Sequence, residues 1–447
     1  MANDSEHRQV GRTWTKATPI LFICATALFT GACANAFVSL ERRGDRAGLT
    51  REVETEHKLG RISNGEARAL AEEVVHSEIL KASPAEFASR LNAVYGCSES
   101  AESAVRSQMA KEALWLEGAN YLMRTGRASK GAYASYLDDA REGYQALATY
   151  SLTGSSDGDR RRRSLVHVSL NIRRAAARAS LEARDERDID VLLERSRLEP
   201  DPFVRADVLR AALANPSSKV VPALVELGFS RGDEQIRTEV LSAFATTLFR
   251  KGGKEEFKRA LAGDANESVL MASLLYLRSR ASLSKQDPLE ADVREMATSV
   301  VVDKLNRGTS REKSNALRLV PMTEPFLDGV RAAATKERDL SVRVLAWSKL
   351  IDVAQDRDGA KKSLLSVAGN NHGRITGQAE LVLAERGDRA IQSWIERELV
   401  EGDKERRLQA VRSLEALGVV ARAAPLLLDQ DATFRLRAAC LIAASSR

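Results

Sequence analysis

The feature that most constrains this sequence is a repeat of about 32 residues in its second half. Residues 171–176, 203–208 and 235–240 each carry an aliphatic residue, then an arginine, then a small or aliphatic residue three positions further on. A hairpin of this length cannot bury its apolar face alone, so the repeat predicts stacked units. The aliphatic position, here called the first slot, is followed along the chain through Ile172, Val204, Ile236, Val269, Glu312, Val342, Ile375, Arg406 and Phe434.

A second slot lies four residues after the first and holds a small or aliphatic side chain in every unit. Small side chains at a helix contact let the two helices approach closely. The interval between Val269 and Glu312 is longer than the others, and residues 284–288 form an apparent insertion there. The second slot holds Ala176, Val208, Val240, Ser273, Ala316, Ala346, Ala379, Ala410 and Ala438.

The position three residues before the first slot predicts where a helix begins. It holds Asp201, Asp233, Asp339, Asp403 and Asp431, and in the other units Ser169, Asn266, Thr309 and His372. Aspartate, serine, asparagine and threonine are the preferred N-cap residues. Because each aspartate precedes an arginine by four residues, we expect a ladder in which it pairs with a guanidinium of its own or an adjoining unit. The arginines of this ladder are Arg205, Arg237, Arg343, Arg407 and Arg435.

Composition agrees with a helical fold. Aromatic residues are 5% and the chain has 10 prolines, which disfavours a β-sandwich or barrel. Hydrophobic residues at 44% and charged residues at 29% exclude wholesale disorder. The net charge of +6 on 447 residues does not imply nucleic acid or an anionic membrane as a partner. The predicted fold class is all-α.

The segment Asp-x-x-Val-Arg-x-x-Val-Leu-x-Ala at 201–211 resembles a HEAT repeat of the short kind shared with phycobilisome lyase-type proteins. The resemblance covers residues 160–447, about nine units of two helices each. It implies a right-handed α-solenoid, in which helix pairs stack into a curved rod. Terminal units of a solenoid need polar outer faces, yet this chain is apolar almost to its end.

The N-terminus predicts export. A polar start with basic residues precedes an apolar run at 19–32, the pattern of a signal peptide over residues 1–33. Gly31-Ala32-Cys33 resembles a bacterial lipoprotein signal, in which the cysteine is lipidated, although Thr30 stands where that signal prefers an aliphatic residue. Lipid on Cys33 would hold the protein on a membrane facing the periplasm. Two alternatives are cleavage after residues 34–36, which gives a soluble periplasmic protein, and an uncleaved anchor over residues 19–40.

The chain between the signal and the repeats divides into a tether at 34–48, a helical region at 49–153 and a linker at 154–159. Ser63 with Glu66, and Ser83 with Glu86, have the spacing of capping boxes. Residues 133–147 carry tyrosines at helical spacing, which predicts a helix with a packing seam. Residues 49–152 are expected to cap one end of the repeat array.

The four cysteines are too few and too scattered to predict a disulfide framework or a metal site. Cys24 would leave with the signal peptide. Cys97 and Cys440 lie far apart in sequence, so they are expected to be buried thiols rather than a disulfide.

The densest charge is basic: residues 160–181 contain no acidic residue and the arginines Arg160, Arg161, Arg162, Arg163, Arg173, Arg174 and Arg178. Two interpretations are open. The guanidinium groups bind an anionic partner, or they form a solvated helix start beside Asp157 and Asp159.

No nucleotide-binding, hydrolase or metalloprotease motif is present, so the sequence predicts no catalytic residue, cofactor or metal site. It predicts a non-enzymatic, membrane-tethered scaffold of the bacterial cell envelope that binds another envelope protein. Nucleic acid and small-molecule substrates are not expected. The alternative function is an enzyme on a HEAT-like scaffold, lyase-type or DNA-glycosylase-like, with no identifiable catalytic residues.

Overall fold

The computed structural model describes residues 36–229, 234–249, 253–263, 266–279, 288–370 and 373–445. Within these ranges the ordered elements are α-helices and short 3-10 helices, without a strand, which confirms the all-α class. The predicted signal segment with Cys33, the capping positions Asp233 and His372, and all of the apparent insertion except Pro288 lie outside the described residues.

The helical N-terminal region begins earlier than residue 49, because residues 36–43 already form a helix. Phe37 is buried, and the buried carboxylate of Glu41 accepts a hydrogen bond of 2.6 Å from Ser77 Oγ. The elements that follow are α2 (Arg46–Lys58), α3 (Asn64–Leu80), α4 (Pro84–Ala93), η1 (Tyr95–Cys97), α5 (Ser98–Gln108), α6 (Glu112–Arg124), η2 (Lys130–Tyr136), α7 (Glu142–Thr149) and η3 (Ser155–Asp157).

Both predicted capping boxes are present, at the starts of α3 and α4. The single helix expected over residues 133–147 is wrong: the chain forms η2, then an irregular segment, then α7. The predicted packing seam is confirmed, because Tyr133, Tyr136 and Tyr144 surround Trp115, and the Tyr144 ring stacks on the indole at 4.7 Å between centroids.

From residue 158 onward the elements succeed one another in pairs, as the repeat predicted. The pairs are α8 (Gly158–Leu165) with α9 (Leu170–Ala183), α10 (Ile189–Leu198) with α11 (Pro202–Ala214), α12 (Val220–Phe229) with α13 (Glu234–Ala245), α14 (Lys254–Leu261) with α15 (Glu267–Ser279), α16 (Pro288–Arg307) with α17 (Ser310–Leu319), α18 (Phe326–Lys336) with α19 (Leu340–Leu350), α20 (Arg357–Ala368) with α21 (Arg374–Ala384), α22 (Gln392–Glu401) with α23 (Lys404–Ala416), and η7 (Val420–Leu428) with α24 (Ala432–Ala444). Short 3-10 turns, η4 (Glu186–Asp188) and η6 (Arg389–Ile391), precede α10 and α22.

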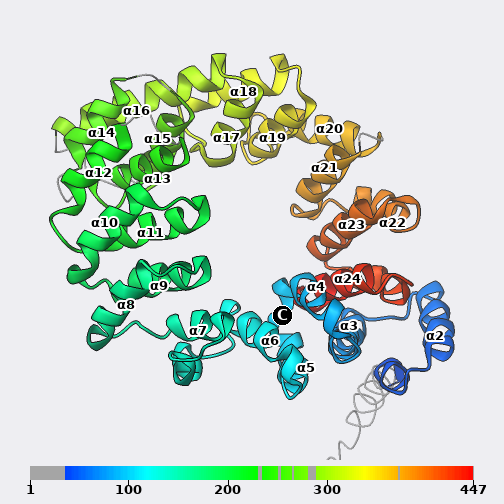
Figure 1. Cartoon of the computed structure of the whole chain (residues 1–447). Coiled ribbons are helices and arrows are strands. Elements are labelled where there is room, and N and C mark those ends of the chain that lie inside the picture. The colour runs from blue at the N-terminus through cyan, green and yellow to red at the C-terminus, as the bar shows by residue number, and fades with distance from the viewer. Residues whose placement is uncertain are drawn as a thin grey trace, which may run out of the picture.

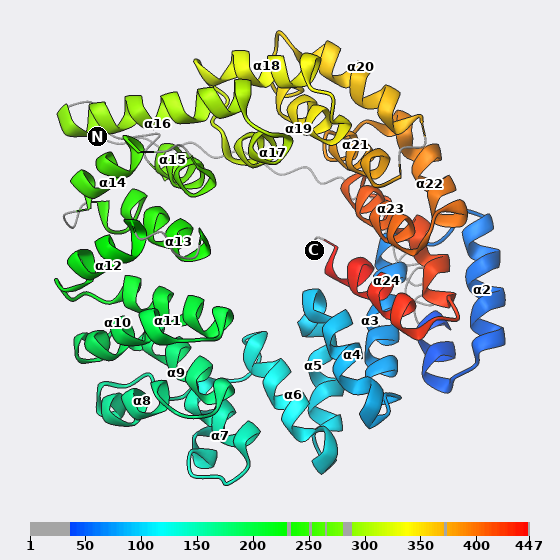
Figure 2. The same ribbon diagram turned by 45° about the horizontal axis from the view of Figure 1, so that its top comes forward.

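These helices follow one another around a ring (Figure 1). In the repeat half, from α9 to α23, the second helix of each pair lies toward the inside of the ring and the first toward the outside (Figures 1 and 2). The second helices contact one another in chain order up to α24. Helix α24 then packs against α3 and α4, and α7 packs against α9. The N-terminal helices therefore bridge the two ends of the repeat half instead of capping one of them.

The two slots explain how the second helices pack. Every residue of the second slot is buried, from Ala176 to Ala438. Most of the first slot is buried as well, whereas Ile236, Glu312 and Ile375 are half-buried. This arrangement is compatible with the array of helical repeats expected from the sequence.

The predicted N-caps are confirmed wherever the position is described. The side chain at the cap accepts a hydrogen bond from a backbone N–H of the first helical turn in seven units, at Ser169, Asp201, Asn266, Thr309, Asp339, Asp403 and Asp431.

The expected pairing of the capping aspartate with the arginine four residues later does not form at 339, 403 or 431, where the aspartate oxygens bind the helix start. In three units the cation that follows the first slot reaches an acid two residues before the next cap. Arg173 binds Glu199, Lys313 binds Glu337 and Arg407 binds Asp429, at 2.8, 2.8 and 3.1 Å. A ladder between neighbouring units therefore exists, with a different acid from the predicted one.

The second slot provides a test of this packing. Ala410→Leu places a larger side chain between buried helices of the ring and should lower the free energy of unfolding by about 1–3 kcal/mol. Ala416→Leu, at an exposed position of the same helix, is the control and should change it by less than about 0.5 kcal/mol. Urea unfolding followed by circular dichroism measures both. Equal effects of the two substitutions would contradict the assignment of Ala410 to a close helix contact.

Candidate functional site

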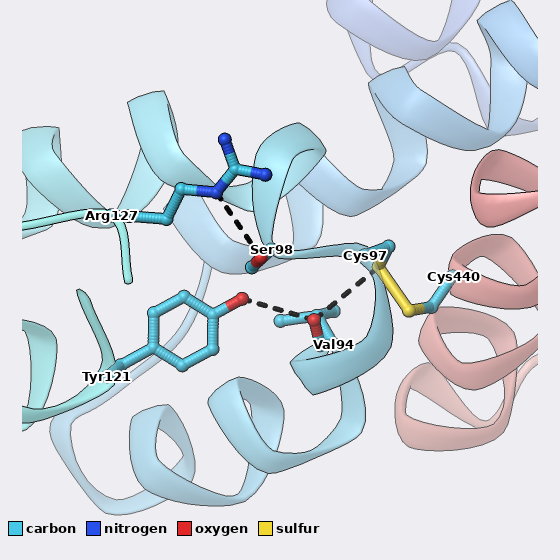
Figure 3. The surroundings of a disulfide bond; sticks show 6 residues. All are labelled: Val94, Cys97, Ser98, Tyr121, Arg127 and Cys440. Atoms are coloured by element: carbon cyan, nitrogen blue, oxygen red, sulfur yellow. Dashed lines mark hydrogen bonds between the residues drawn. A yellow bond between two sulfur atoms is a disulfide. The ribbon is translucent and has the colours of Figure 1, made fainter. Parts of the chain in front are cut away.

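The seam where the last repeat meets the N-terminal helices is the most distinctive part of the ring. Cys97, at the end of η1, and Cys440, in α24, form a disulfide with Cα atoms 5.3 Å apart, as Figure 3 shows. The expectation of two buried free thiols is therefore wrong. The two cysteines are 343 residues apart in sequence, and they meet because the ring closes.

The disulfide lies in a buried environment built by η1 and α6 (Figure 3). Tyr121 Oη donates a hydrogen bond of 3.1 Å to the carbonyl oxygen of Val94, and Cys97 Sγ lies 3.6 Å from the same oxygen. Burial raises the pKa of Tyr121 to about 12, so this hydroxyl keeps its proton and remains a donor at neutral pH. Packing and these contacts hold Cys97 in place beside its partner.

A buried network of charges joins the same elements. The Glu78 carboxylate in α3 accepts one hydrogen bond from Arg435 of α24 and another, at 3.0 Å, from Arg90 of α4. All three side chains are at least nine-tenths buried. Arg435 occupies the cation position of its repeat, so α3 supplies the acid that the next repeat would otherwise supply.

Polar groups at the rim of the seam complete the contact. Asn64 Nδ2 donates to the carbonyl oxygen of Gly418 at 2.7 Å, and Asn64 Oδ1 accepts from the backbone N–H of Ala421 at 3.0 Å. Arg68 Nε donates to Ser445 Oγ at 2.9 Å. These bonds attach the first turns of α3 to the turn after α23 and to the end of α24.

A pocket of about 430 Å³ lies beside the disulfide. Its walls come from α21, α23 and α24 on one side and from Ala93 and Gly96 on the other, and Cys440 is part of its surface. We call it the seam pocket. Its charged side chains are Arg374, Arg412, Arg437 and Glu405, three cations and one anion.

The charges of the seam pocket are only partly matched. Arg437 Nη1 donates to Glu405 Oε1 at 2.7 Å, and this hydrogen bond lowers the pKa of the Glu405 carboxyl. Arg374 and Arg412 are exposed, and neither has an ion-pair or hydrogen-bond partner for its guanidinium group within the described ranges. The pocket therefore has an excess of positive charge.

Glu380 lies on the buried side of α21, behind this pocket. Burial raises its pKa to about 7, against the attraction of the Arg406 guanidinium, whose Nη2 lies 3.6 Å from Glu380 Oε2. Arg397 also lowers the pKa of Glu380, while Glu398 raises it. Glu380 is thus a carboxyl group that gains or loses its proton near neutral pH inside the ring wall.

The arginines of residues 160–181 are for the most part paired within the protein. Arg161 is fully buried and binds Asp185 and Asp188, Arg162 binds Asp188 at 3.0 Å, and Arg160 binds Asp138. These acids follow or precede the arginines by more than twenty residues, so the local sequence did not reveal them.

The remaining arginines of that run behave similarly. Arg173 makes two hydrogen bonds to Glu199, at 2.9 and 2.8 Å, and Arg174 and Arg178 share Asp207, each at 3.0 Å. Arg163 is exposed and has no partner in the described part of the chain. The structure therefore offers most of these groups an internal acid, and binding of an external anion by this arginine run stays a prediction.

The predicted ladder arginines also have local roles. The Arg343 guanidinium lies 5.5 Å from the ring of Trp347, and that of Arg407 lies 4.7 Å from the ring of Phe434.

The residues of the seam pocket were not identified from the sequence, although these residues share repeat positions. The pocket residues fall at three positions relative to the first slot. One residue before it are Arg374 and Glu405, and three residues after it are Gln378, Gln409 and Arg437. Six residues after it are Leu381, Arg412 and Cys440. Aligning the units on the first slot would have placed these residues on one helix face.

The described residues contain no group of three or more histidine, cysteine, aspartate or glutamate side chains that could hold a metal ion. None of the helices within the described ranges is both long and apolar enough to cross a bilayer. The chain matches no protein-family model, and it matches no curated protein.

The buried charges of the seam lead to a stability prediction. Glu78→Gln leaves the buried Arg435 without a carboxylate and Arg90 with only Glu86, at 3.3 Å, and should lower the free energy of unfolding by about 3–5 kcal/mol. Glu112→Gln, which removes the exposed pair with Arg141 at 3.7 Å, is the control and should cost less than about 1 kcal/mol. Chemical denaturation of both variants measures the difference, and a small loss for Glu78→Gln would contradict the importance of the network.

Glu380 leads to a prediction about pH. Between the ordinary pKa of 4.5 and the raised value of about 7, the folded chain holds a proton that the unfolded chain has lost. The free energy of unfolding therefore falls as the pH rises through this window. Glu380→Gln should remove about 1–3 kcal/mol of the difference in stability between pH 5 and pH 8.

Glu385→Gln, at an exposed position just after α21, is the matched control and should leave the pH dependence unchanged. Urea titrations at the two pH values measure the effect. A Glu380→Gln variant with the same pH dependence as the unsubstituted chain would show that this carboxyl does not titrate near neutrality.

Proposed function

We propose that this protein is an exported HEAT-like scaffold, held on a membrane of the bacterial cell envelope by lipid on Cys33, that binds another envelope protein. The observation that carries the proposal is the buried disulfide between Cys97 and Cys440. Structural disulfides form and persist in oxidising compartments such as the periplasm and are rare in the cytosol. This agrees with the export signal expected from residues 1–33, whose pattern is independent of the two cysteines.

The repeat half supports the assignment to HEAT-like repeats. Buried second slots, N-caps at the predicted positions and cation–acid pairs between successive units are what a right-handed solenoid of such repeats requires. The solenoid in this proposal is joined end to end by the N-terminal helices. A ring of this kind presents a continuous row of second helices, which suits binding of a protein through many modest contacts.

A non-enzymatic role fits this arrangement better than the alternative enzyme on the same scaffold. The seam pocket carries two cations, Arg374 and Arg412, without an ion pair in the described residues, and its one acid, Glu405, is engaged by Arg437, which suits binding of an anion. No specific observation favours a lyase or a DNA glycosylase, so neither is proposed.

The location is tested in cells. A palmitate analogue should label the protein through Cys33, and Cys33→Ala should abolish both the label and retention in the membrane fraction. Cys24→Ala, within the signal, is the matched control and should keep both. Retention in the membrane fraction without the label would contradict lipidation and favour the uncleaved single-span anchor.

The redox state of the seam tests export independently. In protein collected from cells under acid quench, Cys97 and Cys440 should react with a maleimide only after reduction. A chain that starts at residue 36, made in the cytosol, should react without reduction. Free thiols at both positions in the full-length chain would contradict export.

A further inference from the structure

The seam pocket differs from equivalent places on the ring in its charge. Along the second helices, arginines six residues after the first slot occur again at Arg178, Arg210 and Arg318. Arg178 and Arg210 are matched, because Asp207 accepts from Arg178 at 3.0 Å and from Arg210 at 3.3 Å, and Glu239 accepts from Arg210 at 2.8 Å. Arg318 is exposed and, like Arg412, has no acid partner within the described residues. Arg412 holds the same position in its unit and has no such acid.

The reason lies in the neighbouring positions. Three residues after the first slot, where Asp207 and Glu239 stand in their units, the units around the pocket have Gln378, Gln409 and Arg437. The single acid of the pocket, Glu405, is engaged by Arg437. The seam pocket thus has two guanidinium groups, of Arg374 and Arg412, without an ion pair or hydrogen bond within the described residues, although the charge of Arg374 also lowers the pKa of Glu405.

The uncharged side chains that line the seam pocket restrict which ligands can bind there. Leu381, Leu408 and Leu441 provide apolar surface within the pocket. The side-chain amides of Gln378 and Gln409 each offer a hydrogen-bond donor and an acceptor, which can pair with the C=O and N–H groups of a peptide main chain. A volume of about 430 Å³ is within the range of ligand sites in proteins. Guanidinium, amide and leucine side chains together match a polypeptide that carries carboxylates and apolar side chains.

We propose that the seam pocket binds an acidic, leucine-containing segment of a partner polypeptide, with its carboxylates on Arg374 and Arg412 and an apolar side chain on the leucines. This inference rests on the proposed function, since it names the chemistry of the protein partner. One wall of the pocket, Ala93 and Gly96, comes from the N-terminal helices, so the binding site exists only in the closed ring.

The test uses the full-length protein and a short fluorescent peptide in which glutamate and leucine recur among serines. Fluorescence anisotropy should show saturable binding that weakens as salt is added. Arg412→Glu should weaken binding at least about tenfold, because it removes a charge-assisted hydrogen bond and adds repulsion. Arg338→Glu makes the same charge change at an exposed position before α19 and should leave binding unchanged.

Two further peptides test the chemistry of the ligand. Replacing glutamate by lysine should abolish binding, and replacing leucine by serine should weaken it. Equal binding of the leucine-free peptide would overturn the apolar part of the proposal. Equal loss of binding in Arg412→Glu and Arg338→Glu would overturn the assignment to this pocket.

A lipid occupant is the outcome that would replace the peptide. Binding of the protein to vesicles with phosphatidylglycerol through Arg412, without binding of the peptide, would overturn the inference. Either this result or a complete absence of peptide binding would overturn the pocket proposal only. The proposed scaffold is tested separately, by the lipid label on Cys33 and by the redox state of Cys97 and Cys440. The two failures are therefore distinguishable.

Discussion

The packing of α24 against α3 is the contact on which the rest of the structure depends. Without α3, helix α24 would expose apolar side chains such as Ile442, which is buried in the ring, to water. Helix α3 covers this face as a further repeat would. It also supplies Glu78 to Arg435, the cation that in other units binds an acid of the next unit. The ring closes because α3 imitates a neighbouring repeat in both its apolar and its charged contacts.

The polar groups of the seam and the disulfide act differently. Desolvation offsets much of the attraction within a buried ion network, so Glu78, Arg90 and Arg435 contribute more to the position of α24 than to net stability. A disulfide acts mainly on the unfolded chain, and closing a loop of 343 residues is worth roughly 6 kcal/mol in the chain-entropy account. The charges thus select how the ends meet, and the disulfide then holds them together.

The sequence predicted what is local and repeats. Helix caps at Asp201 and Asp431 and the buried second slot from Ala176 to Ala438 follow from spacing alone, because their partners lie within the same unit or the next. Ring closure does not follow from spacing, since a period contains no information about whether its ends meet. The pairing of Cys97 with Cys440 and the acids that bind Arg161 depend on that closure or on tertiary contacts, and they were missed for this reason.

The candidate site combines both kinds of information. Its arginines stand at repeat positions, so aligning the units could locate them. That they have no acidic partner is visible only when units are compared. Arg210 pairs with Asp207 and Glu239, whereas Arg412 pairs with neither an aspartate nor a glutamate within the described residues. An unmatched cation on a stable helix lowers stability slightly through repulsion from Arg374 and Arg437, which a bound carboxylate relieves. The excess of positive charge therefore lies in a pocket that ring closure completes, because Ala93 and Gly96 form one of its walls. A ligand in this pocket would contact both the N-terminal helices and the last repeats. Such a ligand would stabilise the closed ring by mass action, so partner binding and ring closure favour each other.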